Sequence, residues 1–299
     1  MSDAQRGVDY SAIHRIDSPA NRLVREEIWP PGHDLGQQSF ATLDYFDHLI
    51  RRLGLAEGVR VLDIGSGTGG PAIYLASHSG CHLTGVEINE VGVEVARTLA
   101  ATSDLGDRIE FVQGDGMAMP FADESFDVVT SMNVMNVFAD KVALLREVRR
   151  MLRPGGTLAF LSGTFEFGPD DGAARRMIEE GYAIPQYLDS LAGYKSKLLE
   201  AGFVIDEVTE YLSDFEGKVA QWLAAWQKHR DAIAAEQGAE STDHHIEYFK
   251  VYLALMGAGK AGTHLITAPP PEWVAGGAGG WGAPPAGGHD DPPRGSLTR

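Results

Sequence analysis

The sequence lacks several features that define whole classes of protein. Its 299 residues include one cysteine, Cys81, so no disulfide can form within the chain. No apolar run approaches the ~20 residues that a membrane-spanning helix needs, and the first residues, MSDAQRGVDY, contain no apolar core of a signal peptide. We therefore expect a cytoplasmic protein without a membrane partner. We also expect Cys81, which has apolar neighbours, to be a core residue.

Positive charge is also scarce. Lys and Arg total 25 against 42 Asp and Glu, which gives a formal net charge of −17. Because so acidic a surface repels phosphate backbones, we expect no nucleic-acid partner. The neighbouring His244 and His245 have no third ligand at a suitable spacing, so we expect no metal site. A small molecule is the expected partner, and a homodimer is left open.

From residue 59 onward, short β-rich runs alternate with helical patterns. This alternation predicts an α/β fold, a doubly wound, Rossmann-like parallel sheet with helices on both faces. The alternation of strands and helices is interrupted at 165–195. Two helices, at about 215–236 and 243–257, are expected before the last strand. The expected strands are 59–64, 81–88, 108–115, 125–134, 157–164, 203–212 and 262–268.

Three parts are expected along the chain. Residues 1–57 form a helical cap in which the prolines of WPPGHDLG (29–36) separate two helices, the second at 37–55 with Ser39 as its cap. The main domain is 58–268, and it includes 165–195 as an insertion that we expect to form a lid over a bound ligand. Residues 269–299 are Gly- and Pro-rich and are expected to be a flexible tail, although they contain Trp273 and Trp281.

The stretch VLDIGSGTGG (61–70) places a G-x-G-x-x-G pattern between a strand and a helix. Such a loop lets a ligand approach the backbone and meet the N–H groups of a helix. In an NAD enzyme that ligand is a pyrophosphate, which Asp63 would repel at short range. S-adenosylmethionine (SAM) has no phosphate and carries an ammonium that Asp63 can pair with. The residue types therefore favour SAM over NAD.

Two more acids end successive strands. Glu87 ends the second strand, where an acid can accept both hydroxyls of a ribose. Asp115 ends the third, in QGDGMAMPF, where it can bond an adenine amino group with Met117 packing on the ring. Since parallel strands end at one edge of a sheet, the three acids indicate a nucleoside-containing cofactor there.

The motifs VLDIGSGTGG, GVEIN, QGDGMAMPF, FDVVTSMNVMNVFADK and LREVRRMLRPGGTLAF resemble those of class I SAM-dependent methyltransferases, in the small-molecule branch of sarcosine/dimethylglycine, phosphoethanolamine and natural-product methyltransferases. The resemblance covers residues 35 to 268 and implies a seven-stranded sheet whose last strand is antiparallel. It implies that WPPGHDLGQQSF closes over the methionine end of SAM, which leaves S-adenosylhomocysteine as product. The implied cofactor residues are Asp63, Gly65, Ser66, Gly67, Glu87, Ile88, Asp115, Gly116, Met117 and Ser131.

The candidate catalytic residues are Asn133, Asn136 and His33. Small-molecule members of the family often carry an acid or a histidine just after the fourth strand, whereas this chain has SMNVMNVFADK. Since amides cannot take a proton, we expect an acceptor that is already nucleophilic, or a base from elsewhere. His33, in the entry segment, is the histidine considered for that role, and His244 and His245 are expected to be solvated residues at a helix start.

Some alternatives are left open by the sequence. Trp222 and Trp226 share a helix face, which suits either core packing or an aromatic wall over the acceptor. Tyr182, Tyr187 and Tyr194, in or near the insertion, allow the same two interpretations. An NAD(P)-dependent oxidoreductase is disfavoured by Asp63 and by the absence of a Tyr-x-x-x-Lys pair after the fourth strand. A SAM-binding protein without catalysis remains an alternative.

Overall fold

A seven-stranded sheet forms the centre of the computed structural model, which describes residues 18–37, 39–181 and 184–270. The strand order is β3-β2-β1-β4-β5-β7-β6, and β7 alone runs antiparallel to its neighbours. The strands are β1 Arg60–Ile64, β2 His82–Glu87, β3 Ile109–Gln113, β4 Phe126–Met132, β5 Leu152–Phe165, β6 Glu207–Glu210 and β7 Ala261–Ala268. The predicted fold class is confirmed. The segments 1–17 and 271–299, with Trp273 and Trp281, and Tyr182 lie outside the described residues.

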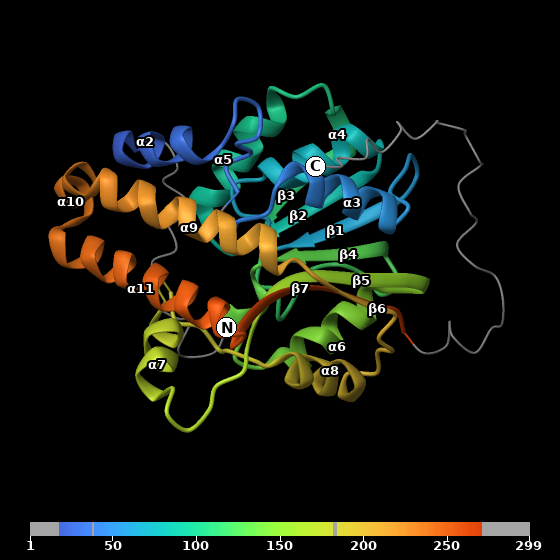
Figure 1. Ribbon diagram of the computed structural model, residues 1–299. Coiled ribbons are helices and arrows are strands. Elements are labelled where there is room, and N and C mark those ends of the chain that lie inside the picture. The colour runs from blue at the N-terminus through green and yellow to red at the C-terminus, as the bar shows by residue number, and fades with distance from the viewer. Residues whose placement is uncertain (1–17, 38, 182–183, 271–299) are drawn as a thin grey trace, which may run out of the picture.

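Helices cover both faces of the sheet, as Figure 1 shows. One core cluster includes side chains of α3 (Leu43–Arg52), α4 (Gly70–Ser79) and α5 (Glu90–Ala101). The other includes side chains of α6 (Lys141–Met151) and α8 (Leu191–Glu200). Pro71 lies in the first turn of α4, and the Asn89 side chain accepts from Gly92 N at the start of α5. Cys81 is fully buried, which confirms its place in the core.

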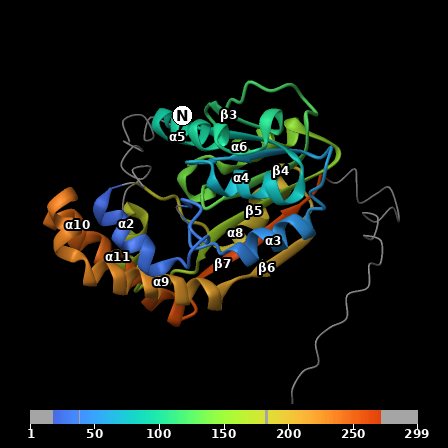
Figure 2. The ribbon, with the colours of Figure 1, turned by 90° about the horizontal axis from the view of Figure 1, so that it is seen from above.

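A further helical layer lies beyond one end of the sheet (Figures 1 and 2). It contains α2 (Pro19–Ile28), α9 (Leu212–Lys228), α10 (Arg230–Gln237) and α11 (Ala239–Gly257), with α7 (Gly172–Glu180) beside α11. The three helices α9 to α11 form one insertion between β6 and β7. Because β6 and β7 are hydrogen-bonded neighbours, this insertion leaves the sheet and returns to it at nearly the same place.

Two helix predictions were wrong. The expected helix 215–236 is two helices, α9 and α10, which meet at His229; its imidazole contacts Glu27 of α2 at 2.8 Å. No Gly or Pro marks this break, and the residue at it contacts a distant segment of the chain. The expected helix 37–55 begins only at Leu43, with Thr42 rather than Ser39 at its N-cap. The Gln37 side chain instead bonds the backbone of His33, Leu35 and Ala41, and the described residues before Leu43 are not helical.

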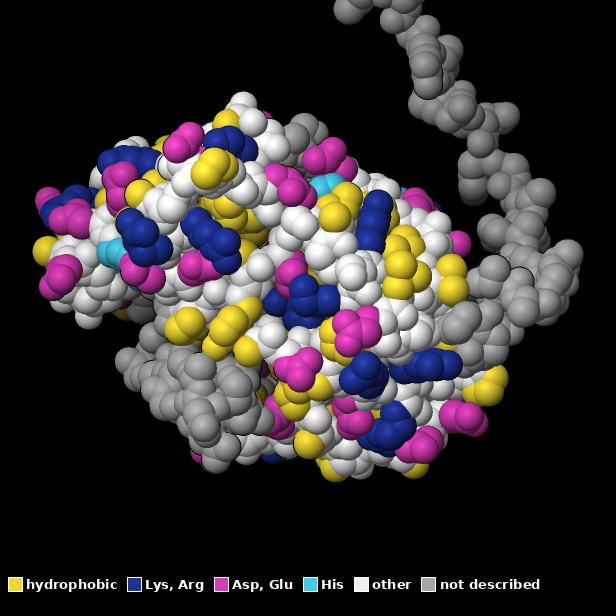
Figure 3. Space-filling view, turned by 90° about the horizontal axis from the view of Figure 1, so that it is seen from below, with side chains coloured by type: hydrophobic (Ala, Val, Ile, Leu, Met, Phe, Trp, Pro, Cys, Tyr) yellow, Lys and Arg dark blue, Asp and Glu magenta, His cyan; other side chains and the backbone are white. Residues whose placement is uncertain are grey.

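Basic residues on the face of α6 and α8 are paired with acids. Figure 3 shows Lys and Arg side chains among Asp and Glu side chains on this face. Arg150 pairs with Glu147 and Asp123, and Arg153 pairs with Asp127. Positive charge here is neutralised locally.

Among the helices of the described segments, none combines the length and apolar character required to cross a bilayer.

Candidate functional site

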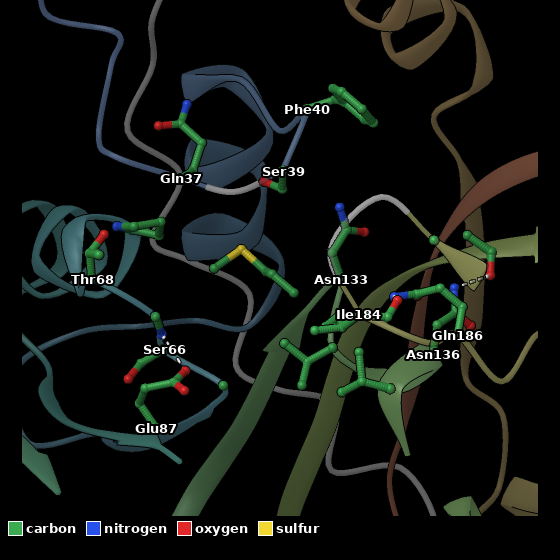
Figure 4. Close-up of a pocket in the computed structure, with 18 of the residues that line it drawn as sticks. Gln37, Ser39, Phe40, Ser66, Thr68, Glu87, Asn133, Asn136, Ile184 and Gln186 are labelled. Carbon is green, nitrogen blue, oxygen red and sulfur yellow. Dashed lines mark hydrogen bonds between the residues drawn. The ribbon is translucent and has the colours of Figure 1, made fainter. Parts of the chain in front are cut away.

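One cavity of about 630 Å³ brings together most of the residues singled out in the sequence. It opens at the carboxyl ends of β1, β2 and β4 and continues beneath the helical layer of α9 and α11. Figure 4 shows the N-terminal segment with Gln37, Ser39 and Phe40 on one side, and Ile184 and Gln186 on another. The fold therefore joins the glycine loop and the insertions around one enclosed space.

The first two glycines of the loop are required by its backbone and its packing. Gly65 and Gly67 have φ angles of 72° and 56°, in the left-handed region that favours glycine. A Cβ on Gly65 would collide with the side chain of Val134. The N–H groups of Gly65 and Ser66 donate to the carbonyl oxygen of Val86 at 2.8 and 3.1 Å, which fixes the loop on β2.

Gly70, the last glycine of the pattern, serves a contact within the protein. A Cβ on Gly70 would overlap the carbonyl oxygen of Leu35 in the N-terminal segment. Thr68 Oγ1 also donates to the carbonyl oxygen of Gly36 at 3.3 Å. The segment therefore crosses directly over the start of α4, in agreement with the expected closure over the cofactor loop.

Arg25 of α2 holds the same segment from the other side. This buried guanidinium bonds both carboxylate oxygens of Asp34, and its Nη1 donates to the carbonyl oxygen of Gln37 at 3.3 Å. Although burial acts in the opposite direction, the hydrogen bonds from Arg25 and Gly36 keep the pKa of Asp34 below its ordinary value. The one Arg that lines the cavity is thus already engaged with a carboxylate.

Glu87 and Asp63 have contrasting environments. Glu87 is buried, and its two oxygens accept from the N–H groups of Gly67 at 3.0 Å and Asn89 at 2.9 Å (Figure 4). Asp63 is buried at the end of β1, where Oδ1 accepts from Thr130 Oγ1 at 2.8 Å. Burial, with a contribution from the Glu87 charge, raises the pKa of Asp63 to about 7. A cationic group beside Asp63 would favour its ionised form.

Most of the expected cofactor residues line the cavity, and two do not. Those that line it are Asp63, Gly65, Ser66, Gly67, Glu87, Ile88, Asp115 and Gly116. Ser131 is buried inside β4, and Met117 packs on the core below the sheet. Phe138 does line the cavity, and a Cβ on Gly116 would lie 3.0 Å from its ring, so Phe138 packs beside Gly116 at the cavity wall. The sequence analysis did not single out Phe138.

The two asparagines after β4 line the cavity but differ in their contacts. Asn133 has a φ of 55°, a conformation that Asn tolerates better than most residues. Its side-chain amide has no hydrogen-bond partner within the described segments. Asn136 accepts from the Tyr194 hydroxyl at 2.6 Å and donates to the carbonyl oxygen of Gly163 at 3.4 Å. The Asn136 amide is therefore committed to the protein, while the Asn133 amide is available to a ligand.

The proposed catalytic histidine is not at this site, whereas another histidine is. His33 is exposed and does not line the cavity. His245 was expected to be solvated, and this expectation was wrong: α11 begins at Ala239, so His245 lies within the helix, is 7% exposed and lines the cavity. Its ring stacks on Trp226 with centroids 4.7 Å apart. His244 contacts the carbonyl oxygen of Gly181 instead.

Trp222 and Trp226 pack on the core cluster of the helical layer and also line the cavity. The core interpretation of their spacing is therefore confirmed, and a role beside the acceptor stays a prediction. Tyr194 is fully buried and bonds Ser162 and Asn136, so it belongs to the core. The Tyr187 carbonyl oxygen accepts from Lys141 Nζ at 2.6 Å, and this lysine also pairs with Asp189 at 3.2 Å.

The two ends of the segment that follows β5 lie next to each other. Phe165 N donates to the carbonyl oxygen of Asp189 at 2.9 Å, so the chain leaves and rejoins the sheet at one point. Between these residues, Ile178, Ile184 and Leu188 line the cavity. This placement agrees with a lid. A second wall comes from α9, whose tryptophans were one candidate wall from the sequence, and from α11, which was not expected at the site.

The donor set fits SAM. The three acids Asp63, Glu87 and Asp115 line the cavity together, where they suit an ammonium, two ribose hydroxyls and an adenine amino group. Ser66 Oγ is buried without a hydrogen-bond partner in the described part of the chain, which is unusual for a buried hydroxyl unless a ligand is bound. Arg25, paired with Asp34, is not free for a pyrophosphate. Nowhere in the described ranges do three His, Cys, Asp or Glu side chains form a metal-binding group.

Comparison with known proteins agrees with this site. Residues 62–160 match the family described as methyltransferase domain. The 27-O-demethylrifamycin SV methyltransferase of Amycolatopsis mediterranei is 36% identical over 188 residues, which cover 60% of this chain and 68% of the relative. A sterol 24-C-methyltransferase of Gibberella zeae is 37% identical over 165 residues, 52% of this chain and 42% of the relative.

Solved structures agree on the fold. The mycolic acid cyclopropane synthase CmaA1, complexed with S-adenosylhomocysteine, superposes with a TM-score of 0.73 at 17% identity, over 83% of this chain and 93% of that one. The strand order, the three acids at the sheet edge and these similarities agree with one another. The chain belongs to the class I SAM-dependent methyltransferases, in their small-molecule branch.

Proposed function

We propose that Asp63, Gly65, Ser66, Gly67, Glu87, Ile88, Asp115 and Gly116 hold SAM, and that the rest of the same cavity holds a small-molecule acceptor. The observation that supports this proposal is the joint placement of the glycine loop, the three acids and the helical layer around one space. The proposed parts are the cap 1–57, the methyltransferase domain 58–268 and the lid 165–195, to which the insertion of α9 to α11 is added.

The bound cofactor supplies a methyl group on a sulfonium, and the protein positions the reactants and excludes water. Gly65 and Gly67 allow the backbone to approach the ligand closely, and the segment 35–40 covers the loop. Asn133 offers an amide that can orient the acceptor near the end of β4. Positioning of this kind contributes several kcal/mol to lowering a barrier, on the order of 7–11 at most.

The reaction as proposed needs no base at the end of β4. The polar groups of Asn136 are bonded within the protein, and an asparagine amide does not take a proton. An acceptor that is already nucleophilic, or a base brought by another part of the cavity, therefore remains the hypothesis. The relatives methylate a rifamycin hydroxyl and a sterol carbon by their names, so O- and C-methylation are the two reactions to test first.

Calorimetry with SAM, S-adenosylhomocysteine and NADH tests the proposed cofactor site. We expect the first two to bind and NADH not to bind. Glu87→Ala removes charge-assisted hydrogen bonds worth about 1.5–3 kcal/mol, so it should weaken SAM binding about 10- to 100-fold. Glu110→Ala, which changes an exposed acid of β3, is the matched control and should bind SAM normally. Equal binding by both variants would contradict the proposed site.

Transfer of label from methyl-labelled SAM into a metabolite extract tests catalysis. A SAM-binding protein without catalysis would bind the cofactor and transfer no label. Homodimer formation and a cytoplasmic location stay predictions from the sequence.

A further inference from the structure

Lys141 carries a buried positive charge at a position where two physical effects oppose it. Its side chain is 2% exposed, and it is the first residue of α6, where the helix dipole favours an anion. Burial lowers the pKa of Lys141, and the Asp189 carboxylate acts in the opposite direction. Proteins retain such local conflicts mainly at functional positions.

Three oxygen atoms surround the ammonium group of Lys141. Its Nζ donates to the carbonyl oxygens of Phe138 at 3.1 Å and of Tyr187 at 2.6 Å, and it pairs with Asp189 Oδ2 at 3.2 Å. An ammonium has three donors, as many as these oxygens. Lys141 also does not line the cavity. Its ammonium therefore binds parts of the protein to one another and is not directed at a ligand.

The first oxygen belongs to the loop 133–138, which we call the post-β4 loop. Except for Met135, every residue of this loop lines the cavity. Phe138 packs beside Gly116, which follows Asp115 of the proposed cofactor site. The post-β4 loop is therefore a wall of the space proposed for the cofactor.

The other two oxygens belong to residues 184–189, which we call the returning segment because it leads back from the lid. Ile184, Gln186 and Leu188 of this segment line the cavity. The Tyr187 N–H donates to the carbonyl oxygen of Asn136 at 2.6 Å, and Gln186 accordingly lies next to Asn136 in Figure 4. The returning segment thus contacts the post-β4 loop directly, and Lys141 bonds both.

Asp189 anchors the end of the returning segment and has a second lysine partner. Its Oδ1 accepts from Lys197 Nζ at 2.5 Å, and its carbonyl oxygen accepts from Phe165 N at 2.9 Å. Lys197 is 32% exposed and has no bond to the post-β4 loop among the described residues. The two lysines therefore share one carboxylate, but of the two it is Lys141 that also bonds the loop.

We propose that Lys141 is a positioning residue whose ammonium fastens the returning segment to the post-β4 loop, so that a cofactor bound beside the loop orders the wall that faces the acceptor. This inference rests on the proposed function, which places SAM beside the loop and the acceptor beside the lid. Lys141 touches neither reactant and acts through Phe138, Tyr187 and Asp189. The acceptor then meets an ordered wall once the methyl donor is in place.

Hydrogen exchange of the full chain, with and without S-adenosylhomocysteine, tests this coupling. The N–H groups of Gln186 and Tyr187 report on it, because each donates to a backbone carbonyl oxygen at 2.6 Å. In the wild type, ligand at about 100 times its Kd should slow their exchange, by at most about 100-fold. Lys141→Met removes the donors. In this variant the ligand should still bind, yet slow the exchange by about twofold or less. Undiminished protection in Lys141→Met overturns the proposal.

Lys197→Met is the matched control, because it removes a lysine from the same carboxylate and leaves the contact with the post-β4 loop intact. It should retain the protection by ligand. The ratio of exchange rates without and with ligand is compared within each variant, so a general loss of stability does not imitate the effect. Equal loss of protection in both variants would show that the two lysines only hold Asp189 in place, and it overturns the proposal.

Asp189→Asn replaces Lys141→Met if the latter does not fold. The amide keeps an oxygen that can accept from the lysines and loses the charge, so protection of Gln186 and Tyr187 should fall about fivefold. Full protection in Asp189→Asn overturns the proposal.

Transfer of label from methyl-labelled SAM into a metabolite extract adds a kinetic test. Because a misplacement of about 1 Å can cost about 100-fold in rate, Lys141→Met should lower the rate about 10- to 100-fold without raising KM for SAM. Lys197→Met should transfer label at nearly the wild-type rate. A wild type that does not bind S-adenosylhomocysteine contradicts the proposed function and this inference with it. A wild type that binds it and transfers label, but shows no protection of Gln186 and Tyr187, overturns the inference alone.

Discussion

Replacing the buried carboxylate of Asp63 by the amide of asparagine should raise the stability of the protein and weaken cofactor binding. Burial raises its pKa from 3.8 to about 7, and one unit corresponds to about 1.4 kcal/mol. Ionising Asp63 in the folded protein therefore costs about 4 kcal/mol. Since the raised pKa belongs to an acid, this cost is absent below pH 4, grows between pH 4 and 7, and is fully present above pH 7.

Asp63→Asn removes the charge and keeps an oxygen that can accept from Thr130 Oγ1. At pH 8 the variant without ligand should be more stable than the wild type, by at most about 4 kcal/mol, because it has no ionisation cost. At pH 4.5 the two should be nearly equal. SAM binding should change in the other direction, with a loss of about 10- to 100-fold at pH 8, because the ammonium loses its ionised partner.

Denaturant unfolding at the two pH values and calorimetry with SAM measure both effects. Wild-type SAM affinity should fall about tenfold per pH unit below 7, as protonation of Asp63 competes with binding, and Asp63→Asn should flatten this dependence. Asp107→Asn, at an exposed turn, is the control and should show neither effect. Lower stability of Asp63→Asn at pH 8, or unchanged SAM affinity, would refute the reasoning.

Two further substitutions test how the cavity is enclosed. Gly70→Ala should displace the segment at Leu35, lower the unfolding free energy by about 1–3 kcal/mol and raise KM for SAM. Gly217→Ala is the control, because a Cβ added there meets open space. It should not lower stability in thermal unfolding. Tyr194→Phe leaves the Asn136 carbonyl without its donor and should cost about 1–3 kcal/mol in denaturant unfolding; unchanged stability would show that this buried bond contributes nothing.

The positions of the strands and of the cofactor site follow from local pattern. All seven strands were predicted near their observed positions because apolar, β-rich runs are bounded by glycine, proline and polar residues. Asp63, Glu87 and Asp115 could be brought together from sequence alone, since parallel strands present their carboxyl ends at one edge. These inferences require only local sequence and one general property of α/β folds.

The acceptor side could not be derived in this way, because contacts between distant segments create it. The break at His229 lies where this residue contacts Glu27 of α2, and nothing near it in the sequence marks a helix end. His245 resembled a residue at a helix start because the preceding AESTD contains few apolar residues, yet α11 extends through this stretch. Phe138 was overlooked because one apolar residue in a loop carries no periodic signal.

The placement of α9 to α11 between two hydrogen-bonded strands has an evolutionary consequence. The Tyr211 N–H donates to the carbonyl oxygen of Thr263 at 2.9 Å, so the backbone closes the base of the insertion independently of what lies within it. Because this bond uses backbone atoms alone, changes of side chains within the insertion remove neither it nor the pairing of β6 with β7. The glycine loop and the three acids of the cofactor site lie outside the insertion and remain in place. Acceptor range can therefore diverge between descendants of one ancestor while the methyl donor stays the same.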